Sequence, residues 1–319
     1  MTDMRSEPHT VAVIGTGAIG ASWAALALAH GATVWASDPA EQAERRLRAT
    51  VEDHLGELDA GPAAMDRLRF HTDVAAAVAG ADLVIESGPE ILEVKRELFA
   101  VLDAAAAPDV VLASGSSGFG PSSFQDACRR PERVVVAHPF NPPHLVPLVE
   151  VVGGRDTAEE TITATMAAMA ALGRAPVRIR AELPGHVVNR LQAALWREAY
   201  DLIGRGAITV ADLDFAVSCG PGLRWALLGP IATQHLSGGE GGLGHVLDHL
   251  GPPMVAWWAD LGEPELTAEL SARLVRGVAE ELGGRERDVL ARRDHALREL
   301  LALKERLGLA EAFAGGETR

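Results

Sequence analysis

Short apolar runs alternate with helical patterns through the first half of the chain. Each run is rich in strand-forming residues and ends in Gly, Ser, Asp or Pro. The segments between most of them carry apolar residues at helical spacing, as in AIGASWAALALAHG (18–31) and PAEQAERRLRATVEDHLGELDAG (39–61). The predicted strands are TVAVIG (10–15), ATVWASD (32–38), RLRFHTD (67–73), DLVIES (82–87), VVLASGS (110–116) and RVVVAHP (133–139), with two more expected at 145–152 and 175–180 around a helix at 157–172. This alternation predicts a doubly wound, mostly parallel sheet.

The pattern changes after residue 184, where strand-like alternation ends. A long helix is predicted over 183–206 with Pro184 near its start, and a shorter one over 208–220 with Thr209 as its N-cap. Three later segments also have helical spacing: 240–262, 267–282 and 285–308. We therefore predict an α/β protein in which a Rossmann-like domain (1–184) is followed by an all-helical second domain (185–319).

Composition narrows the classes of protein that fit this fold. The chain has 319 residues, 48% of them hydrophobic, and a formal charge of −15 that would repel nucleic-acid phosphates. No apolar stretch approaches the length of a membrane span, and the polar first residues lack the apolar region of a signal peptide. The two cysteines, Cys128 and Cys219, are too few for a disulfide framework. We expect a cytoplasmic protein that binds neither nucleic acid nor a membrane.

The first predicted strand is followed by a G-x-G-x-x-G motif, Gly15-Thr16-Gly17-Ala18-Ile19-Gly20. In a strand–turn–helix setting the three glycines allow a tight turn, close approach of a pyrophosphate, and helix packing. The phosphate then binds at the N-terminus of the next helix. Outside such a setting the motif is weak, because glycines also cluster in ordinary turns.

The second predicted strand ends in Asp38, about where a ribose-binding acid is expected. Its carboxylate would accept hydrogen bonds from the adenosine ribose and would repel a 2′-phosphate. Pro39 and Ala40 follow it, so no adjacent arginine is offered to such a phosphate. These features predict NAD rather than NADP as cofactor.

A histidine and a glutamate stand in the apolar stretch VVVAHPFNPPHLVPLVEVVGG (134–154). Burying His138 and Glu150 is costly unless they are partnered, and each is the obvious partner of the other. A strand-end histidine in such a sheet faces the ligand crevice, and oxidation of an alcohol needs a base near neutral pH. We predict that His138 is the base and that Glu150 orients it. A buried structural pair is the alternative.

Taken together, these motifs resemble those of the 3-hydroxyacyl-CoA dehydrogenase superfamily over nearly the full chain. GTGAIG, ESGPEILEVKRELF, SGSSGF, HPFNPPHLVPLVEVVGG and PGHVVNRLQAALWREA stand in the order and spacing of that family. The resemblance implies that His138 and Glu150 form the catalytic dyad. It also implies that Ser117 and Asn189 contact the reacting oxygen of the substrate. Either residue alone has an ordinary structural explanation, as a turn serine and a hydrogen-bonded helix asparagine.

The same resemblance assigns further roles. It places Glu90 and Lys95 near the nicotinamide side of the cofactor. It also implies a homodimer formed through the helical second domain.

Two segments depart from the acyl-CoA enzymes of this family. The stretch between Asp38 and the strand at 67–73 is shorter and more acidic than a CoA site would prefer. GPGLRWALLGP (220–230) resembles the branch that contains carnitine dehydrogenase, L-gulonate 3-dehydrogenase and the lens crystallin related to them. Arg224 in that segment would pair with the carboxylate of a free acid, which a thioester lacks. A protein acid or the dimer surface is the alternative partner for Arg224.

The resulting hypothesis is an NAD-dependent dehydrogenase that oxidises a small 3-hydroxy acid of the carnitine or gulonate kind. Position 144 holds His where a dedicated carnitine site is expected to hold Tyr. A dehydrogenase acting on a 3-hydroxyacyl-CoA thioester and a non-catalytic, crystallin-like NAD-binding protein are the competing hypotheses. No metal site is expected, and His245 and His249 are interpreted as surface or pocket histidines.

Overall fold

The computed structural model describes residues 8–309, which divide into two compact units. The first unit extends to Arg190 and the second begins at Leu191. Residues 185–190 group by their contacts with the first unit, and the domain boundary predicted after residue 184 stays a prediction. No helix within 8–309 is both long and apolar enough to cross a lipid bilayer.

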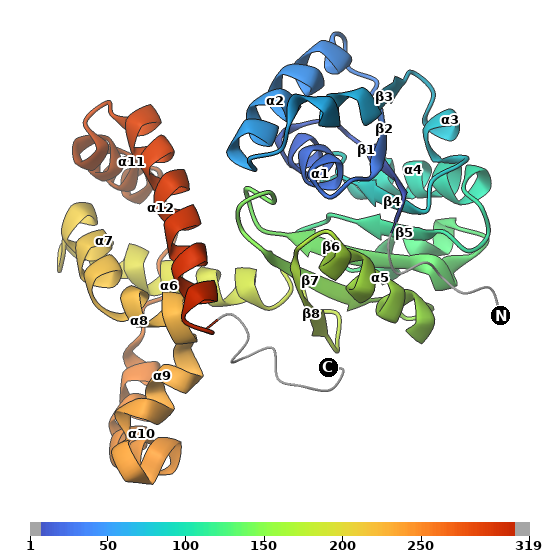
Figure 1. Ribbon diagram of the computed structural model, residues 1–319. Helices are drawn as coiled ribbons and strands as arrows, with labels where there is room; N and C mark the ends of the chain where they lie inside the picture. The colour runs from blue at the N-terminus through green and yellow to red at the C-terminus, as the bar shows by residue number, and fades with distance from the viewer. Residues whose placement is uncertain (1–7, 310–319) are drawn as a thin grey trace. The chain divides into compact units, whose positions relative to one another are not determined.

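The first unit is built on an eight-stranded sheet with strand order β3-β2-β1-β4-β5-β6-β7-β8 (Figure 1). Neighbouring strands are parallel except β6 and β7, which are antiparallel. The mostly parallel, doubly wound sheet predicted from the sequence is therefore confirmed. The strands are β1 (Thr10–Ile14), β2 (Thr33–Ser37), β3 (Leu68–His71), β4 (Leu83–Glu86), β5 (Val111–Ser114), β6 (Val134–Pro139), β7 (Leu148–Gly153) and β8 (Ala175–Ile179).

Helices cover both faces of this sheet (Figure 1). Val11 and Val13 of β1 belong to one core cluster, whereas Ala12 and Ile14 belong to another, as the alternation of side chains along a strand requires. The first cluster includes residues of α1 (Ala18–Ala29), α2 (Ala43–Glu57) and α5 (Glu159–Ala171). The second includes residues of α3 (Val74–Val78) and α4 (Leu92–Ala105). Short 3-10 helices lie at Pro62–Arg67, Pro121–Ser123, Gln125–Ala127 and Pro131–Arg133.

The order of the strands determines where functional residues meet. Strands β2 and β3 are added on one side of β1, and β4 and the later strands on its other side. The carboxyl ends of β1 and β4 therefore border a crevice. The loops after β1, β2, β4, β5 and β6 all leave the carboxyl edge of the parallel sheet. Residues far apart in sequence are thereby gathered at one edge.

The second unit contains helices only, apart from its loops, within the described residues. Thr209 caps α7 as predicted, because its side chain accepts a hydrogen bond from the Asp212 N–H. The 3-10 helix Gly239–Gly241 precedes α10. The α-helices are α6 (Val188–Gly204, which begins in the first unit), α7 (Val210–Cys219), α8 (Pro221–Leu228), α9 (Pro230–Ser237), α10 (Gly242–Asp260), α11 (Ala268–Leu282) and α12 (Glu286–Arg306).

Two details differ from the predicted elements. Helix α6 begins at Val188 rather than near Pro184, because Gly185 and His186 adopt φ values of 72° and 53°, which are incompatible with an α-helix. Helices α8 and α9 are not anticipated by the sequence pattern. Each begins with a proline in its first turn, Pro221 and Pro230, where the missing N–H costs nothing.

Candidate active site

The glycine motif forms the turn between β1 and α1. Gly15 has φ +88°, and a Cβ there would lie 2.7 Å from the Ser87 carbonyl. A Cβ on Gly20 would lie 1.9 Å from the Gly15 oxygen, so helix and turn pack as the third glycine of the motif requires. For a Cβ built on Gly17, no heavy atom outside its immediate chain neighbours and from the described part of the chain lies within 4 Å. Gly17 also precedes α1, whose first residues include Ala18 and Ile19 and no acid. The turn therefore leaves room for a phosphate at a helix N-terminus.

A pocket of about 720 Å³ opens beside this turn. Asp38 lies in its wall and accepts hydrogen bonds from the backbone N–H groups of Thr16 (2.7 Å) and Ala40 (2.8 Å). Its fixed carboxylate suits ribose hydroxyls. No arginine or lysine from residues 8–309 lines the pocket, so a 2′-phosphate would find no cation there. Its other walls combine the apolar side chains of Val94, Leu98 and Val101 with the polar Thr72 and Glu97. The pocket fits NAD.

The strands β6 and β7 place His138 directly opposite Glu150. Side chains of opposed residues in an antiparallel pair lie on the same face, and here Nδ1 of His138 is 3.0 Å from Oε2 of Glu150. Both side chains are buried, with residue exposures of 5% and 1%. Among residues 8–309, Nε2 of His138 has no hydrogen-bond partner, and this nitrogen can meet a substrate hydroxyl. The contact between the two residues exists as predicted, and its catalytic role remains a proposal.

Glu150 is also held by the beginning of helix α6. Its Oε1 accepts hydrogen bonds from the backbone N–H groups of Val187 and Val188, each at 3.0 Å. Burial alone would raise the pKa of Glu150, but the bonds from His138, Val188 and Val187 together hold this pKa below its usual value. The carboxylate is therefore kept ionised next to His138.

The loop after β5 carries Ser117, which is exposed. The Asn189 side-chain amide donates to the Ser117 carbonyl at 3.4 Å, so these two predicted substrate contacts lie side by side. His186, three residues before Asn189 in the chain, is completely buried, and its Nε2 is 3.0 Å from the Ser116 carbonyl. Its ring lies 5.1 Å from that of His138. The serine loop, the turn before α6 and the dyad are thus connected.

Glu90 and Lys95 lie on the neighbouring loop and helix. Glu90 accepts bonds from the Ser116 hydroxyl (2.6 Å) and the Gly118 N–H (2.7 Å). These bonds and the nearby Lys95 charge outweigh burial and lower the pKa of Glu90. The Lys95 ammonium is enclosed by protein, 3.0 Å from Glu86 and 3.4 Å from Glu90. Lys95 thus holds two carboxylates in place, and its predicted proximity to the nicotinamide stays a prediction.

Sequence reasoning missed Glu86, Ser114 and His186. Glu86 ends β4 and accepts bonds from the Ser114 hydroxyl (2.6 Å) and from Lys95, which together compensate a fully buried carboxylate. Glu86 and Ser114 could have been found as polar residues inside the apolar runs DLVIES and VVLASGS. His186 could have been found as a histidine that follows a Pro-Gly pair and precedes two valines. Burial is the main cause that lowers the pKa of His186.

Arg224 lies on α8 in the second unit, where it is exposed. Within the described residues it has no ion-pair partner, so a protein acid in 8–309 does not account for it. Its role as a carboxylate clamp remains a prediction. The rings of His245 and His249 stack on α10 with centroids 5.2 Å apart.

Family models match both parts of the chain. The 3-hydroxyacyl-CoA dehydrogenase NAD-binding domain matches residues 10–182, and the C-terminal domain of the same family matches residues 185–276. The two matches together cover most of the chain.

Curated relatives and solved structures agree with these models. The chain is 46% identical to an L-carnitine dehydrogenase of Nocardiopsis dassonvillei, covering 95% of this chain and 94% of that one. It is 43% identical to an L-carnitine dehydrogenase of Pseudomonas aeruginosa, with coverages of 98% and 99%. A crystal structure of 5-formyl-3-hydroxy-2-methylpyridine 4-carboxylic acid (FHMPC) 5-dehydrogenase, described as an NAD+ dependent dismutase, superposes on this chain with a TM-score of 0.77. The identity is 33%, and the match covers 94% of this chain and 98% of that one.

Proposed function

This chain belongs to the 3-hydroxyacyl-CoA dehydrogenase family, and we propose that it oxidises the 3-hydroxyl of L-carnitine or a similar short 3-hydroxy acid to the 3-oxo acid. It is an NAD-dependent dehydrogenase that acts on a CH–OH group. We choose this substrate because the chain is 43–46% identical to two L-carnitine dehydrogenases, and each match covers more than nine-tenths of both chains. FHMPC 5-dehydrogenase acts, by its name, on a compound with a free carboxylic acid, which also favours an acid over a thioester.

In the proposed reaction the substrate alcohol loses a proton to His138 and a hydride to NAD. Nε2 of His138 takes the proton of the substrate hydroxyl, and Glu150 stabilises the imidazolium that forms, because its ionised carboxylate is 3.0 Å from Nδ1. Bound NAD supplies the acceptor for the hydride that leaves the substrate carbon. Both transfers together convert the secondary alcohol to a ketone.

Three further residues hold the substrate in this proposal. The Ser117 hydroxyl and the Asn189 amide, placed together by the bond between Asn189 and the Ser117 carbonyl, donate hydrogen bonds to the reacting oxygen. Arg224 pairs with the carboxylate. A guanidinium binds such a group through two parallel hydrogen bonds, which a CoA thioester cannot offer.

A panel of substrates tests the proposal. Purified protein is mixed with NAD and with L-carnitine, L-gulonate, 3-hydroxybutyrate or 3-hydroxybutyryl-CoA, and NADH formation is followed by absorbance. We expect turnover of at least one free acid, with L-carnitine the best. Turnover of the thioester alone would reject the proposal.

Arg224→Ala should raise the KM for the acid by about ten- to a hundredfold, since it removes hydrogen bonds to a charged group. Arg287→Ala, at an exposed arginine, is the control and should leave this KM unchanged.

We also propose a cytoplasmic homodimer that associates through the helical unit. Several large apolar side chains of this unit are exposed, among them Phe215 (69%), Trp258 (64%) and Val275 (70%). Exposed apolar surface of this kind favours protein association. Cys128 and Cys219 are both free thiols, which suits a reducing compartment. Light scattering coupled to gel filtration would report the mass of a dimer, and a monomer at all concentrations would contradict the assembly.

A further inference from the structure

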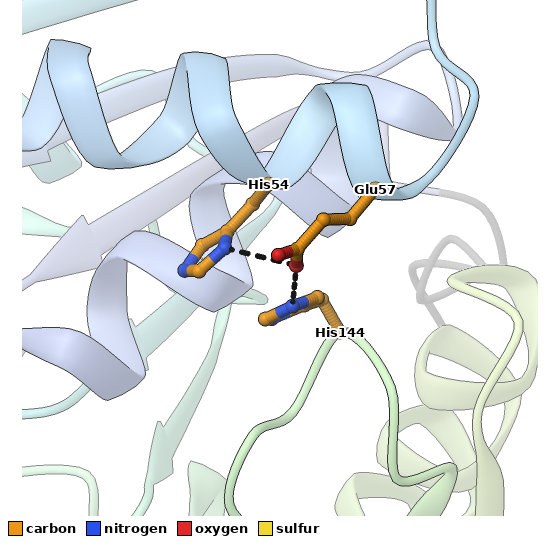
Figure 2. A group of neighbouring side chains, drawn as sticks. All are labelled: His54, Glu57 and His144. Carbon is orange, nitrogen blue, oxygen red and sulfur yellow. Dashed lines mark hydrogen bonds and ion pairs between the residues drawn. The ribbon is translucent and has the colours of Figure 1, made fainter. Parts of the chain in front are cut away.

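A second polar cluster lies in the first unit and takes no part in the proposed reaction. His54 and Glu57 are in the last turn of α2, and His144 lies in the loop between β6 and β7. Figure 2 shows the side chains of His54 and Glu57 directed from the helix toward His144. The cluster has the residue types of a metal site.

The ligand atoms of the three residues converge on a small volume. Nε2 of His144 is 2.7 Å from Oε2 of Glu57, and Nδ1 of His54 is 3.4 Å from the same oxygen (Figure 2). One ligand atom from each residue lies within 4.8 Å of the others. Within residues 8–309 no other group of three or more His, Cys, Asp or Glu side chains meets this condition.

One nitrogen of the cluster has no hydrogen-bond partner among residues 8–309. This nitrogen, Nδ1 of His54, is buried and faces a carboxylate oxygen of Glu57. In the tautomer that carries its proton on Nε2, Nδ1 of His54 and the Glu57 carboxylate both present lone pairs, and their approach is unfavourable unless a cation lies between them. Burial of such a nitrogen is itself costly. A metal ion would satisfy it.

The orientation of His144 is already fixed by a second contact. Its Nδ1 is 2.9 Å from the Ser22 hydroxyl of α1, and only 4% of the residue is exposed. A bond of this kind to Nδ1 orients Nε2 of His144 toward Glu57, and such a second bond is the usual support of a histidine ligand. Ser22 therefore prepares Nε2 of His144 for coordination.

We propose that His54, Glu57 and His144 bind a late first-row divalent metal ion, with Zn²⁺ as the representative. Two imidazoles and a carboxylate match the ligand preference of such ions, whereas Mg²⁺ and Ca²⁺ take oxygen ligands. Three protein ligands leave a fourth, tetrahedral position for water. The rings of His54 and His144 are stacked, with centroids 3.9 Å and planes 30° apart, so coordination requires a rotation of the His54 side chain while α2 stays in place.

The ion would connect parts of the first unit that are distant in sequence. His144 lies between β6, which carries His138, and β7, which carries Glu150. Coordination would tie this connecting loop to the end of α2. The site is therefore a stabilising clamp in the proposal.

Tag-free protein tests the site. We would titrate it with Zn²⁺ by calorimetry, measure the metal retained after gel filtration, and record the visible spectrum with Co²⁺. We expect about one ion per chain and a higher unfolding temperature with Zn²⁺. His144→Phe, His54→Phe and Glu57→Gln should each weaken binding by at least about tenfold. The first two keep a stacked ring, and the third keeps the shape of a half-exposed side chain.

The matched control removes the other histidine pair. His245→Ala combined with His249→Ala, on α10, should leave both the affinity and the thermal shift unchanged. Loss of binding in this control alone, equal binding by the three cluster variants, or no binding by the unaltered chain would each overturn the proposal. Because Glu57→Gln is expected to fold normally, unchanged NADH binding by this variant makes its loss of metal binding interpretable.

Discussion

The substitution Glu150→Gln tests the proposed dyad most directly. Oε1 of Glu150 accepts two backbone N–H groups, from Val187 and Val188, and Oε2 is bonded to Nδ1 of His138. Glutamine can keep the first two bonds through its carbonyl oxygen. Its amide NH2 then faces His138 and donates to Nδ1, so the proton of the ring must move to Nε2. A protonated Nε2 cannot accept the proton of a substrate hydroxyl.

The size of the effect follows from this change of tautomer. Where an acid that orients a catalytic histidine is replaced by its amide, activity falls by about 10⁴-fold with little change in geometry. We therefore expect kcat to fall by about 10³- to 10⁴-fold, or about 4–5.5 kcal/mol in activation free energy. The free energy of unfolding should fall by only about 1–2 kcal/mol, because the shape and two of the hydrogen bonds remain.

Steady-state kinetics and NADH binding separate this role from a structural one. The variant should bind NADH as tightly as the unaltered protein, and Glu160→Gln, an exposed glutamate on α5, should retain full activity. Activity of Glu150→Gln within about tenfold of the unaltered protein would refute the reasoning, since the wrong tautomer would then not matter. Loss of NADH binding would show instead that the residue is structural.

Three further predictions follow from the described contacts. Asp38→Asn should raise the KM for NAD by about tenfold with little effect on the KM for the acid, because the ribose loses a charged acceptor; kinetics with each substrate varied will check it. His186→Phe should lower the free energy of unfolding by about 1–3 kcal/mol in urea titrations, because it leaves the Ser116 carbonyl unsatisfied. The pKa of Glu150 lies below its usual 4.5 in the folded chain, so its contribution to stability is complete above that pH and is lost as the pH falls through the lower folded value. Thermal unfolding of Glu150→Gln should accordingly depend less on pH below about 4.5.

Most of the first unit could be predicted from the sequence, because its central strands β1, β4, β5, β6 and β7 are buried on both faces and form nearly continuous apolar runs. The reversal between β6 and β7 was harder to see. The segment between Pro139 and Leu148 is too short for a helical crossover, which in retrospect indicates an antiparallel pair. Helices α8 and α9 were missed because glycine and proline, typical of loops, stand at their starts.

The candidate site divides in the same way. Gly15, Asp38 and His138 follow strands, and their chemistry can be inferred from that position alone. The importance of His186 and Glu86 depends on contacts with segments distant in sequence, such as the Ser116 carbonyl, which no local pattern encodes. Arg224 shows the reverse case, since its sequence context suggests a role while residues 191–309 contain no ion-pair partner for it.

The charges around the site suit a reaction in which the positive charge is lost from the nicotinamide and gained by His138. In the proposed oxidation the positive charge of the nicotinamide disappears as the hydride arrives, and a positive charge appears on His138 as it takes the proton. Two carboxylates with lowered pKa values, Glu90 and Glu150, stay ionised throughout. Contacts through Ser116, His186 and His138 connect them. Burial keeps His186 neutral, so it adds no second positive charge beside the imidazolium. The net charge of the pocket is therefore the same before and after the transfer, which limits the reorganisation that the surrounding protein must undergo.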